Sequence, residues 1–590
     1  MQTLNQPSMP AFQLFGDGVR RSKGDQSRRY NLLAARLVSE LVKNSLGPRG
    51  MDKMFIDIFG EVTVTKDGAT LLRKIDVEHP AAKVLIEASN AVDNEVGDGT
   101  TSVVVLAGAL VRKAEEMLDM GISPSVIIDG YAKSLDIALE ALDDIAQKCS
   151  NSDKLVMKRL VNTCLQSKAL SYVGDKAVDQ LVDAISSIAN FSTNTVDIDD
   201  IKIEEKQGST VDMQLVRGVV IDKTIDSSSM PKSLEKARIL LIDEDLEGKR
   251  TKTEAETIID SPEQIAGYIE NEKMMIRSKL QHIIDSGANV VISRKGINTF
   301  AQNILREAGI ISVRRVKEND LLWLAKATGG TIAGRLDHDN RHNHHDHHHD
   351  DNHHHQHYHH ADIEFRLGYA ESVYEKAVGD DKMVFLDGCK NPKSVTLLLR
   401  ANSKSTLDEC HRSALDALSV LKDFIKSPSI VAGGGSSEAA IARKVRVTAS
   451  LYAGREQIVI SKFADALEEI PITIAENAGM DAIDTLVQLR SRHASSKLSH
   501  HGIDAFERKV GEMFPDIIEP AVVKEQVLKT AVEVVNLLVR VDDVLMARPA
   551  SNTHTHKDGT SHSHAGGDKE HRHDHFDRLG KIQRPAHHYY

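Results

Sequence analysis

The chain has 590 residues, more than one hydrophobic core usually serves, so its length predicts several domains. Its 74 Lys and Arg residues against 86 Asp and Glu residues give a formal net charge of −12, which argues against a nucleic-acid partner held by a basic field. Four cysteines without metal-ligand spacing and an N-terminus without a signal-peptide pattern indicate the reducing cytoplasm. No apolar run approaches the roughly 18 residues of a membrane span, so we expect a soluble protein with no membrane partner.

The first predicted element is a helix that ends in a glycine loop. "SLGPRG" at 45–50 stops this helix with Gly47 and Pro48. Its apolar face is predicted from the helical spacing of Tyr30, Leu33, Ala34, Leu37, Val38 and Leu41. Residues 54–66 follow as a short hairpin, which delivers Asp67 of "TKDGAT" to a turn before the next helix.

The next motif is "GDGTTSVVVLAGALV", which begins at residue 97. An apolar stripe predicts a helix here, and it is formed by Val103, Leu106, Ala107, Leu110 and Ala114. The unpaired N–H groups and the positive dipole at the start of a helix suit a phosphate, and the Asp98 carboxylate suits a hard cation such as Mg²⁺. The alternative interpretation is an acidic N-cap between turn glycines.

The middle of the chain changes character. Elements are mixed from about 153 to 215, and helical character returns after 394. Between about 216 and 393, the strand-like runs "ARILLID", "ANVVIS", "ISVRRV" and "KMVFLDG" alternate with helical stretches. This alternation predicts an α/β domain inserted into a mostly helical one.

The segment "HRSALDALSVLKDFI" predicts another helix. Its apolar stripe comprises Ala414, Ala417, Leu418, Leu421 and Ile425. Asp416 therefore lies on the opposite face with Arg412 and Asp423, and the local pattern predicts solvated surface for all three. "AGGGSSE" at 432–438 is a further glycine loop before a helix start, but no P-loop pattern G-x-x-x-x-G-K-[ST] occurs in the chain.

Two His-rich segments stand apart from this pattern. Of the 28 histidines, thirteen lie between His338 and His360 and nine between His554 and His588. We expect the insertion at 337–361 to project as a surface loop, because it contains little that can be buried. Clustered imidazoles suit Zn²⁺ or Ni²⁺, and the alternative is a tolerated low-complexity insert. The candidate ligands are His344, His345, His347, His348, His349, His353, His354 and His355.

Eight segments that occur in order along the chain carry a resemblance. They are "SLGPRGMDKM", "VTKDGATLL", "DVEHPAAKVL", "GDGTTSVVVLAGAL", "DKMVFLDGCKNPKSVTLLLR", "DALSVLKDF", "VAGGGSSE" and "AENAGMDAIDTL". Together they resemble a group II chaperonin subunit of the archaeal thermosome type. The resemblance implies a multidomain α+β and α/β fold with a mostly helical equatorial ATP-binding domain, a small intermediate hinge domain and an α/β apical substrate-binding domain.

The domain boundaries implied by the resemblance are equatorial 18–152 and 427–548, intermediate 153–215 and 394–426, and apical 216–393. A helical lid protrusion is expected at about 247–275, and the His-rich tail at 549–590 is expected to be disordered. The implied function is that of an ATP-dependent chaperone, which encloses non-native client proteins in two stacked rings of about eight identical or paralogous subunits. Hydrolysis of ATP with Mg²⁺ would close the built-in lid.

The resemblance also implies roles for single residues. Asp98 would hold Mg²⁺, and Asp67 and Asp416 would be the catalytic pair that positions and activates water. Lys168 would sense the γ-phosphate, whereas its alternative interpretation is an ordinary exposed lysine. The implied nucleotide contacts are Leu46, Gly47, Pro48, Gly97, Gly99, Thr100, Thr101, Ser102, Lys168, Gly434, Gly502 and Glu519, of which Gly434 and Glu519 would touch the ribose.

Two departures and two rival functions remain open at this point. Lys66 stands where archaeal-type relatives usually have Asn, and the C-terminus is His-rich where a Gly-Met-rich tail is common. One rival is an ATP-dependent enzyme acting on a small substrate, for which the sequence offers no second catalytic constellation. The other is a metal-storage protein, which rests on the His-rich segments alone.

Overall fold

The computed structural model describes residues 20–75, 77–166, 168–247, 262–334, 366–389, 393–495 and 500–546, and the short segments 553–555 and 561–563. The candidate metal ligands from His344 to His355, nearly all of the predicted tail and residues 248–261 of the predicted lid lie outside these residues. Among the residues that are described, no helix is both long and apolar enough to cross a membrane.

The chain divides into two compact units. Met1–Ser27 and Asp542–Tyr590 form one unit, in which β1 (Arg20–Lys23) pairs antiparallel with β19 (Asp543–Met546), and β20 (Thr553–Thr555) with β21 (Ser561–Ser563). The other unit, Arg28–Val541, contains three large hydrophobic cores, which we number in the order in which the chain first enters them.

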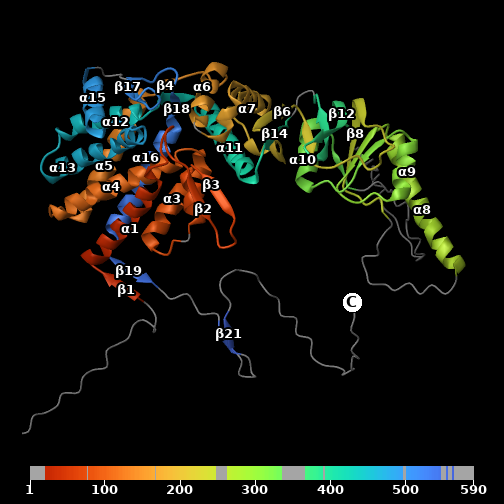
Figure 1. Ribbon diagram of the computed structural model, residues 1–590, viewed down its shortest axis with the longest axis horizontal. Coiled ribbons are helices and arrows are strands. Elements are labelled where there is room, and N and C mark those ends of the chain that lie inside the picture. The colour runs from red at the N-terminus through yellow and green to blue at the C-terminus, as the bar shows by residue number, and fades with distance from the viewer. Residues whose placement is uncertain are drawn as a thin grey trace, which may run out of the picture. The chain divides into compact units, whose positions relative to one another are not determined.

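The first core is mostly helical and is built from both halves of the chain (Figure 1). Its helices are α1 (Asp25–Lys43), α2 (Gly68–Lys74), α3 (Pro80–Val96), α4 (Thr100–Asp119), α5 (Pro124–Ile145), α12 (Ser436–Ala449), α13 (Arg455–Leu467), α14 (Glu469–Asn477), α15 (Ala482–Ser495) and α16 (Ala521–Arg540). The strands β2 (Lys53–Ile56), β3 (Val62–Thr65), β4 (Gln147–Lys148), β15 (Ser429–Ala432), β16 (His501–Asp504), β17 (Lys509–Glu512) and β18 (Ile518–Pro520) stand between these helices in the chain. Val431 of β15 and Ile503 of β16 are buried in the first core, whereas Ile430 of β15 and Ile518 of β18 are buried in the second.

Helix α4 lies at the centre of the first core. All residues from Val103 to Val111 are buried, so the helix is covered on every face over this run. The predicted stripe is confirmed, since four of its residues lie in the run and Ala114 is also buried. An apolar helix of this kind is stable only when other helices surround it. The hairpin predicted at 54–66 is confirmed, because β2 and β3 pair antiparallel.

The predicted apolar face of α1 is wrong in part. Tyr30 and Leu37 are 54% and 61% exposed, whereas Leu32, Ala35 and Val42 are buried in the first core. Helix α1 carries apolar residues on more than one face, so periodicity alone cannot say which face meets the core.

The second core joins two distant parts of the chain. Its elements are α6 (Lys154–Leu165), the 3₁₀ helix η1 (Ala169–Val173), α7 (Asp175–Ile188), the 3₁₀ helix η2 (Ile198–Asp200), β5 (Ile201–Gln207), β6 (Asp212–Val216), β14 (Val395–Ala401) and α11 (Lys404–Lys426). Strand β14 is central, since it pairs parallel with β5 and antiparallel with β6.

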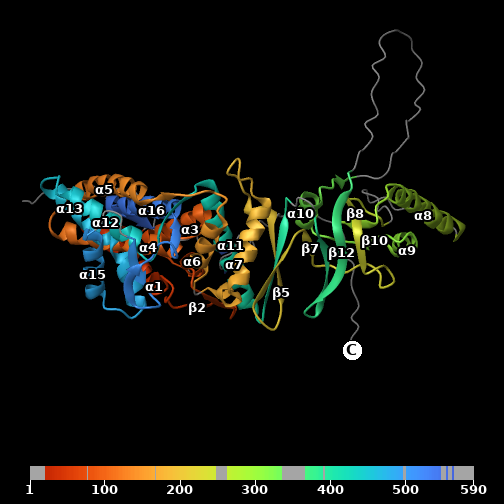
Figure 2. The same cartoon turned by 90° about the horizontal axis from the view of Figure 1, so that it is seen from above.

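The third core is an α/β sandwich, seen from above in Figure 2. Its elements are β7 (Val219–Ile221), β8 (Ser233–Ile242), α8 (Pro262–Asp285), β9 (Val290–Ser293), α9 (Thr299–Glu307), β10 (Ile311–Val313), α10 (Glu318–Thr328), β11 (Ile332–Ala333), β12 (Gly368–Val378) and β13 (Asp381–Asp387). The sheet order is β10-β9-β8-β12-β13-β7, with β11 also paired to β8. The four strand-like runs of the sequence coincide with β8, β9, β10 and β13, which confirms the inserted α/β region.

Candidate functional site

One pocket is lined by glycine loops of the first core and by charged residues of the second core. The sequence-predicted residues that line it are Leu46, Gly47, Pro48, Asp67, Gly97, Asp98, Gly99, Thr100, Thr101, Ser102, Lys168, Asp416, Gly434 and Glu519. Gly502 does not line the pocket but lies behind it, because a Cβ added there would stand 2.8 Å from the Gly434 carbonyl oxygen. Its neighbour Ile503 forms part of the wall.

The start of α4 points into this pocket without a side-chain cap. Gly97 and Gly99 adopt left-handed conformations with φ of 63° and 81°, and Gly99 is the N-cap. Asp98 accepts a hydrogen bond from the N–H of Gly99 at 2.8 Å rather than from the first turn of α4. The interpretation of Asp98 as an N-cap is therefore wrong, and the helix presents its N-terminal dipole to the cavity.

Asp67 is held toward the start of α4 from three sides. Its carboxylate caps α2 by accepting from the N–H groups of Ala69 at 3.2 Å and Thr70 at 2.7 Å, and it accepts from the Thr100 hydroxyl at 2.9 Å. Burial raises the pKa of Asp67, but these hydrogen bonds outweigh burial and the pKa is lowered. The group is an ordered carboxylate at neutral pH.

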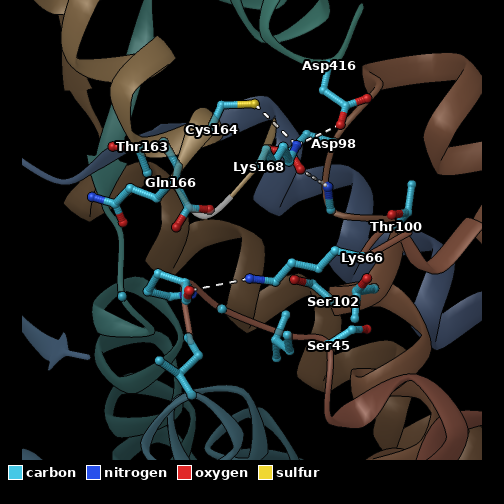
Figure 3. A pocket seen from close by; sticks show the side chains of 18 of the residues that line it. Ser45, Lys66, Asp98, Thr100, Ser102, Thr163, Cys164, Gln166, Lys168 and Asp416 are labelled. Carbon is cyan, nitrogen blue, oxygen red and sulfur yellow. Dashed lines mark hydrogen bonds and ion pairs between the residues drawn. The ribbon is translucent and has the colours of Figure 1, made fainter. Parts of the chain in front are cut away.

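Lys168 and Asp416 form an ion pair, which lies beside Asp98 in Figure 3. The Lys168 Nζ lies 2.6 Å from Asp416 Oδ2 and 3.6 Å from the Cys164 sulfur. Burial raises the pKa of Asp416 to about 7, with Lys168 opposing the shift and the charges of Asp67 and Asp98 adding to it. Burial lowers the pKa of Lys168, but attraction to Asp416 outweighs it, so this amine stays charged.

The predicted solvated face of α11 is wrong. Asp416 and Arg412 line the pocket, and Asp423 is only 5% exposed. This face of α11 turns toward the loop before α4, where a Cβ at Gly97 would come within 2.4 Å of the Ser419 Cβ. Local periodicity predicted the apolar face of α11, which packs in the second core. It could not reveal that a loop of the first core lies against the other face of α11.

Several lining residues were not predicted from the sequence. They are Ser45, Thr163, Cys164, Gln166, Glu409, Arg412, Gly435, Ile470, Ile474, Ala505, Phe506, Ile517 and Lys524. The spacing of Glu409, Arg412 and Asp416 on one helix was an available signal, since residues separated by three, four and seven positions share a face. Arg412 donates to Glu409 at 2.8 Å, so this pair reinforces that face.

Lys66, singled out above as a departure, also lines the pocket. Its Nζ donates to the Pro48 carbonyl at 3.4 Å, and it appears beside Ser45 and Ser102 in Figure 3. Burial lowers its pKa to about 8, and the nearby charge of Lys168 adds to that shift. Lys66 and Lys168 therefore reach the pocket from separate cores, with their pKa values moved in opposite directions.

The polar and apolar linings of the pocket differ. Isoleucines 470, 474 and 503 join Ala505 and Phe506 in an apolar wall, and the Arg49 guanidinium lies 4.9 Å from the centre of the Phe506 ring. The polar lining has the carboxylates of Asp67, Asp98, Glu409, Asp416 and Glu519 and the uncapped helix start. A ligand with a flat apolar part and a phosphate chain fits such a lining.

The residues near Asp98 suit a hard cation better than a transition metal. Magnesium is usually bound through one or two carboxylates together with phosphate oxygens, so Asp98 is a sufficient protein ligand. Within the described ranges, no group of three or more His, Cys, Asp or Glu side chains could hold a metal. The proposed Zn²⁺ or Ni²⁺ ligands lie outside those ranges.

Comparison with known proteins supplies the family. The model of the TCP-1/cpn60 chaperonin family matches residues 38–549. The chain is 42% identical over 561 residues to thermosome subunit alpha of Sulfolobus acidocaldarius, covering 92% of this chain and 96% of the relative. It is also 42% identical to thermosome subunit alpha of Aeropyrum pernix over 540 residues, with coverage of 90% and 93%, and of Archaeoglobus fulgidus over 536 residues, with coverage of 90% and 94%. The chain therefore belongs to the TCP-1/cpn60 chaperonin family, and as a group II chaperonin subunit it is an ATPase that assists protein folding in ring complexes.

Proposed function

We propose that the pocket binds ATP with Mg²⁺ and that hydrolysis of the bound ATP depends on the position of the second core. The observation that carries this proposal is that one pocket is lined by Asp67 and Asp98 of the first core and by Lys168 and Asp416 of the second. A site divided in this way is complete only when the two cores lie together. Hydrolysis of ATP would then occur only when the two domains have closed on each other.

The start of α4 is the proposed phosphate site. Thr100, Thr101 and Ser102 supply N–H groups and hydroxyls at an uncapped helix end, while Gly97 and Gly99 let the backbone approach the ligand closely. Asp98 would hold Mg²⁺, which when bound neutralises phosphate charge. Lys168 adds a cation that comes from the other core.

The proposed catalytic pair divides two tasks. Asp67, fixed by three hydrogen bonds, orients the attacking water. Asp416 receives the proton, because a base with a pKa of about 7 is near the optimum for proton transfer at neutral pH. Phosphoryl transfer depends chiefly on placement and charge neutralisation, so these groups are sufficient.

The remaining contacts follow from the other linings. Leu46, Gly47 and Pro48 would pack on the nucleotide, and Gly434 and Glu519 would contact the ribose. Gly502 would act from behind the wall by letting the backbone at Ile503 approach Gly434, to whose carbonyl the Ile503 N–H donates at 2.8 Å.

The larger assembly is also proposed. The first, second and third cores correspond to the equatorial, intermediate and apical domains, and the start of α8 belongs to a lid over a chamber for non-native proteins. We further propose two stacked rings of about eight identical or paralogous subunits, working in the cytoplasm. The exposed apolar residues of α1 and of the β2–β3 hairpin, including Ile58 at 93% exposed, are consistent with burial between neighbouring subunits.

The test combines particle size with Mg²⁺-dependent turnover. The purified 64.9 kDa chain should form a particle near one megadalton by native mass spectrometry. It should hydrolyse ATP, stop when EDTA removes Mg²⁺, and protect a trapped client from protease only while ATP is present. A monomer or dimer that hydrolyses ATP without protecting any client would contradict the proposal.

A further inference from the structure

Three charged side chains form a buried cluster at the wall of the pocket. Lys524 Nζ lies 2.9 Å from Glu438 Oε1 and 2.5 Å from Glu519 Oε2. The side chains of Lys524 and Glu438 are 8% and 5% exposed, and that of Glu519 is 24% exposed. Glu519 and Lys524 line the pocket, whereas Glu438 does not. One ammonium group therefore serves two carboxylates, of which only Glu519 faces the ligand space.

The two carboxylates are held differently. Glu438 stands in the first turn of α12, where the helix dipole favours an anion, and its Oε2 accepts from the Ser437 hydroxyl at 2.9 Å. Burial raises the pKa of Glu438, but Lys524 outweighs it and the pKa is lowered. For Glu519, burial raises the pKa, Glu438 adds to the rise and Lys524 opposes it. The pKa of Glu519 is raised overall. Glu438 is thus the anchor of Lys524, and Lys524 is the charge that opposes protonation of Glu519.

Gly433 constrains Glu519 from the other side. A Cβ added at Gly433 would stand 2.8 Å from Glu519 Oε1 and 3.0 Å from a methyl group of Ile517. Gly433 is not among the glycines with positive φ, so the missing side chain serves this close approach and not a left-handed turn. Strand pairing sets Glu519 of β18 opposite Val431 of β15, which leads directly into Gly433. The carboxylate is therefore located by Lys524 at one oxygen and by the Gly433 backbone at the other.

We propose that Lys524, anchored by Glu438, is a positioning residue that holds the Glu519 carboxylate where it accepts hydrogen bonds from the ribose hydroxyls, which makes the pocket selective for ribonucleotides over deoxyribonucleotides. This inference rests on the proposed function, since it assumes that ATP binds here. An ionised carboxylate accepts two hydroxyl hydrogen bonds, whereas a protonated or displaced one does not. A hydrogen bond to a charged group contributes about 1.5–3 kcal/mol, which corresponds to a factor of about 10–100 in affinity.

The experiment measures Kd for ATP, 2′-deoxy-ATP and 3′-deoxy-ATP by calorimetry on the full chain. The parental protein should prefer ATP over each deoxynucleotide by about 10–100-fold. In Lys524→Met this ratio should fall to within about threefold of one, because ATP loses affinity while the deoxynucleotides lose little. Lys524→Arg should restore most of the ratio, since it keeps the charge.

Gly433→Ala tests the same carboxylate without removing a buried charge, and it decides the question if Lys524→Met does not fold. It too should lower the ratio. The matched control is Lys529→Met on the same helix, whose side chain is 48% exposed and whose ammonium lies 2.5 Å from Glu525 Oε1. This control should keep the parental ratio.

Three results would overturn the inference. Equal weakening of ATP and the deoxynucleotides in Gly433→Ala and the Lys524 variants would mean that the cluster serves stability alone. A parental protein that binds and hydrolyses ATP but does not discriminate against deoxynucleotides would refute the ribose selectivity and the ribose contact of Glu519, and would leave the proposed ATP hydrolysis intact. A parental protein that binds no ATP would refute both.

Discussion

The pocket contains two buried charge clusters that differ in where their members come from. Lys168 and Asp416 belong to the second core and face Asp67 and Asp98 of the first. Glu438 and Lys524 come from α12 and α16, which pack in the first core, and Glu519 comes from β18, whose Ile518 is buried in the second core. The Lys524 cluster is therefore anchored on two helices of the first core, whereas the Lys168–Asp416 pair comes wholly from the second. This difference separates recognition of the nucleotide from commitment to hydrolysis.

The two clusters also differ in whether a member changes its protonation near neutral pH. In the Lys168–Asp416 pair, burial raises the pKa of Asp416 to about 7, so its protonation changes near neutral pH. In the other cluster, Lys524 has its pKa raised by two carboxylates against the effect of burial, and it stays charged. A fixed charge suits binding, and a group that titrates suits proton transfer. Four experiments break or sharpen this contrast.

Asp98→Ala should have the largest effect. Removing the proposed Mg²⁺ ligand at the helix start should lower ATP turnover at least about a thousandfold, because a bound metal contributes several kcal/mol of charge stabilisation. Steady-state phosphate release, titrated with Mg²⁺, measures this loss. Parental turnover at any Mg²⁺ concentration would contradict the role of Asp98.

Asp416→Asn should lower kcat by about a hundredfold or more, the range expected for loss of a general base. ATP should still bind, since recognition is assigned to the first core. Calorimetry with ATP and single-turnover hydrolysis separate the two quantities. Asp67→Asn is the companion variant from the first core. If Asp416→Asn lost more in ATP affinity than in kcat, the two clusters would not differ in their tasks.

The pH dependence should reveal Asp416 and not Asp67. The base must be ionised, so kcat should be constant above about pH 8 and fall as the pH drops through about 7, where burial places the pKa of Asp416. The pKa of Asp67 is lowered, so it stays ionised through this window. Lys168→Met should move the fall in kcat to higher pH, because Lys168 opposes the rise in the pKa of Asp416. A profile that does not move in this variant would contradict the pairing.

Excision of 337–361 should have the smallest effect on either cluster. The segment stands between β11 and β12 in the chain, and none of the residues that line the pocket belongs to the third core. ATP turnover and particle size should stay within about twofold of parental values, as for surface changes in general. Calorimetry with Zn²⁺ should show that most tight metal binding is lost. Equal Zn²⁺ stoichiometry in both proteins would move the metal site to the C-terminal histidines.

Local features of the fold followed from the sequence. The apolar run after Thr100, the glycine loops at 47 and 97, and the strands β8, β9 and β10 were all predicted from spacing within short windows. Such features depend on neighbours in the chain, which a sequence displays directly. The resemblance then brought together the residues Asp67, Asp98, Lys168 and Asp416, which no local pattern connects.

Tertiary structure decided which polar side chains became buried. Helix α11 shows one apolar stripe, so its sequence predicted a single buried face. On the other face the loop at Gly97 packs against Ser419, and Asp423 is buried as well. In α1 the reverse occurs, and Tyr30 and Leu37 remain exposed although they are apolar. The roles of Gly433, Glu438 and Lys524 are equally hidden, because each depends on Glu519, about 80 residues or more away from the first two in the chain. Periodicity shows which face of a segment packs against one neighbouring element. The energy of a buried charge depends on its charged and polar partners, which only the complete fold brings together.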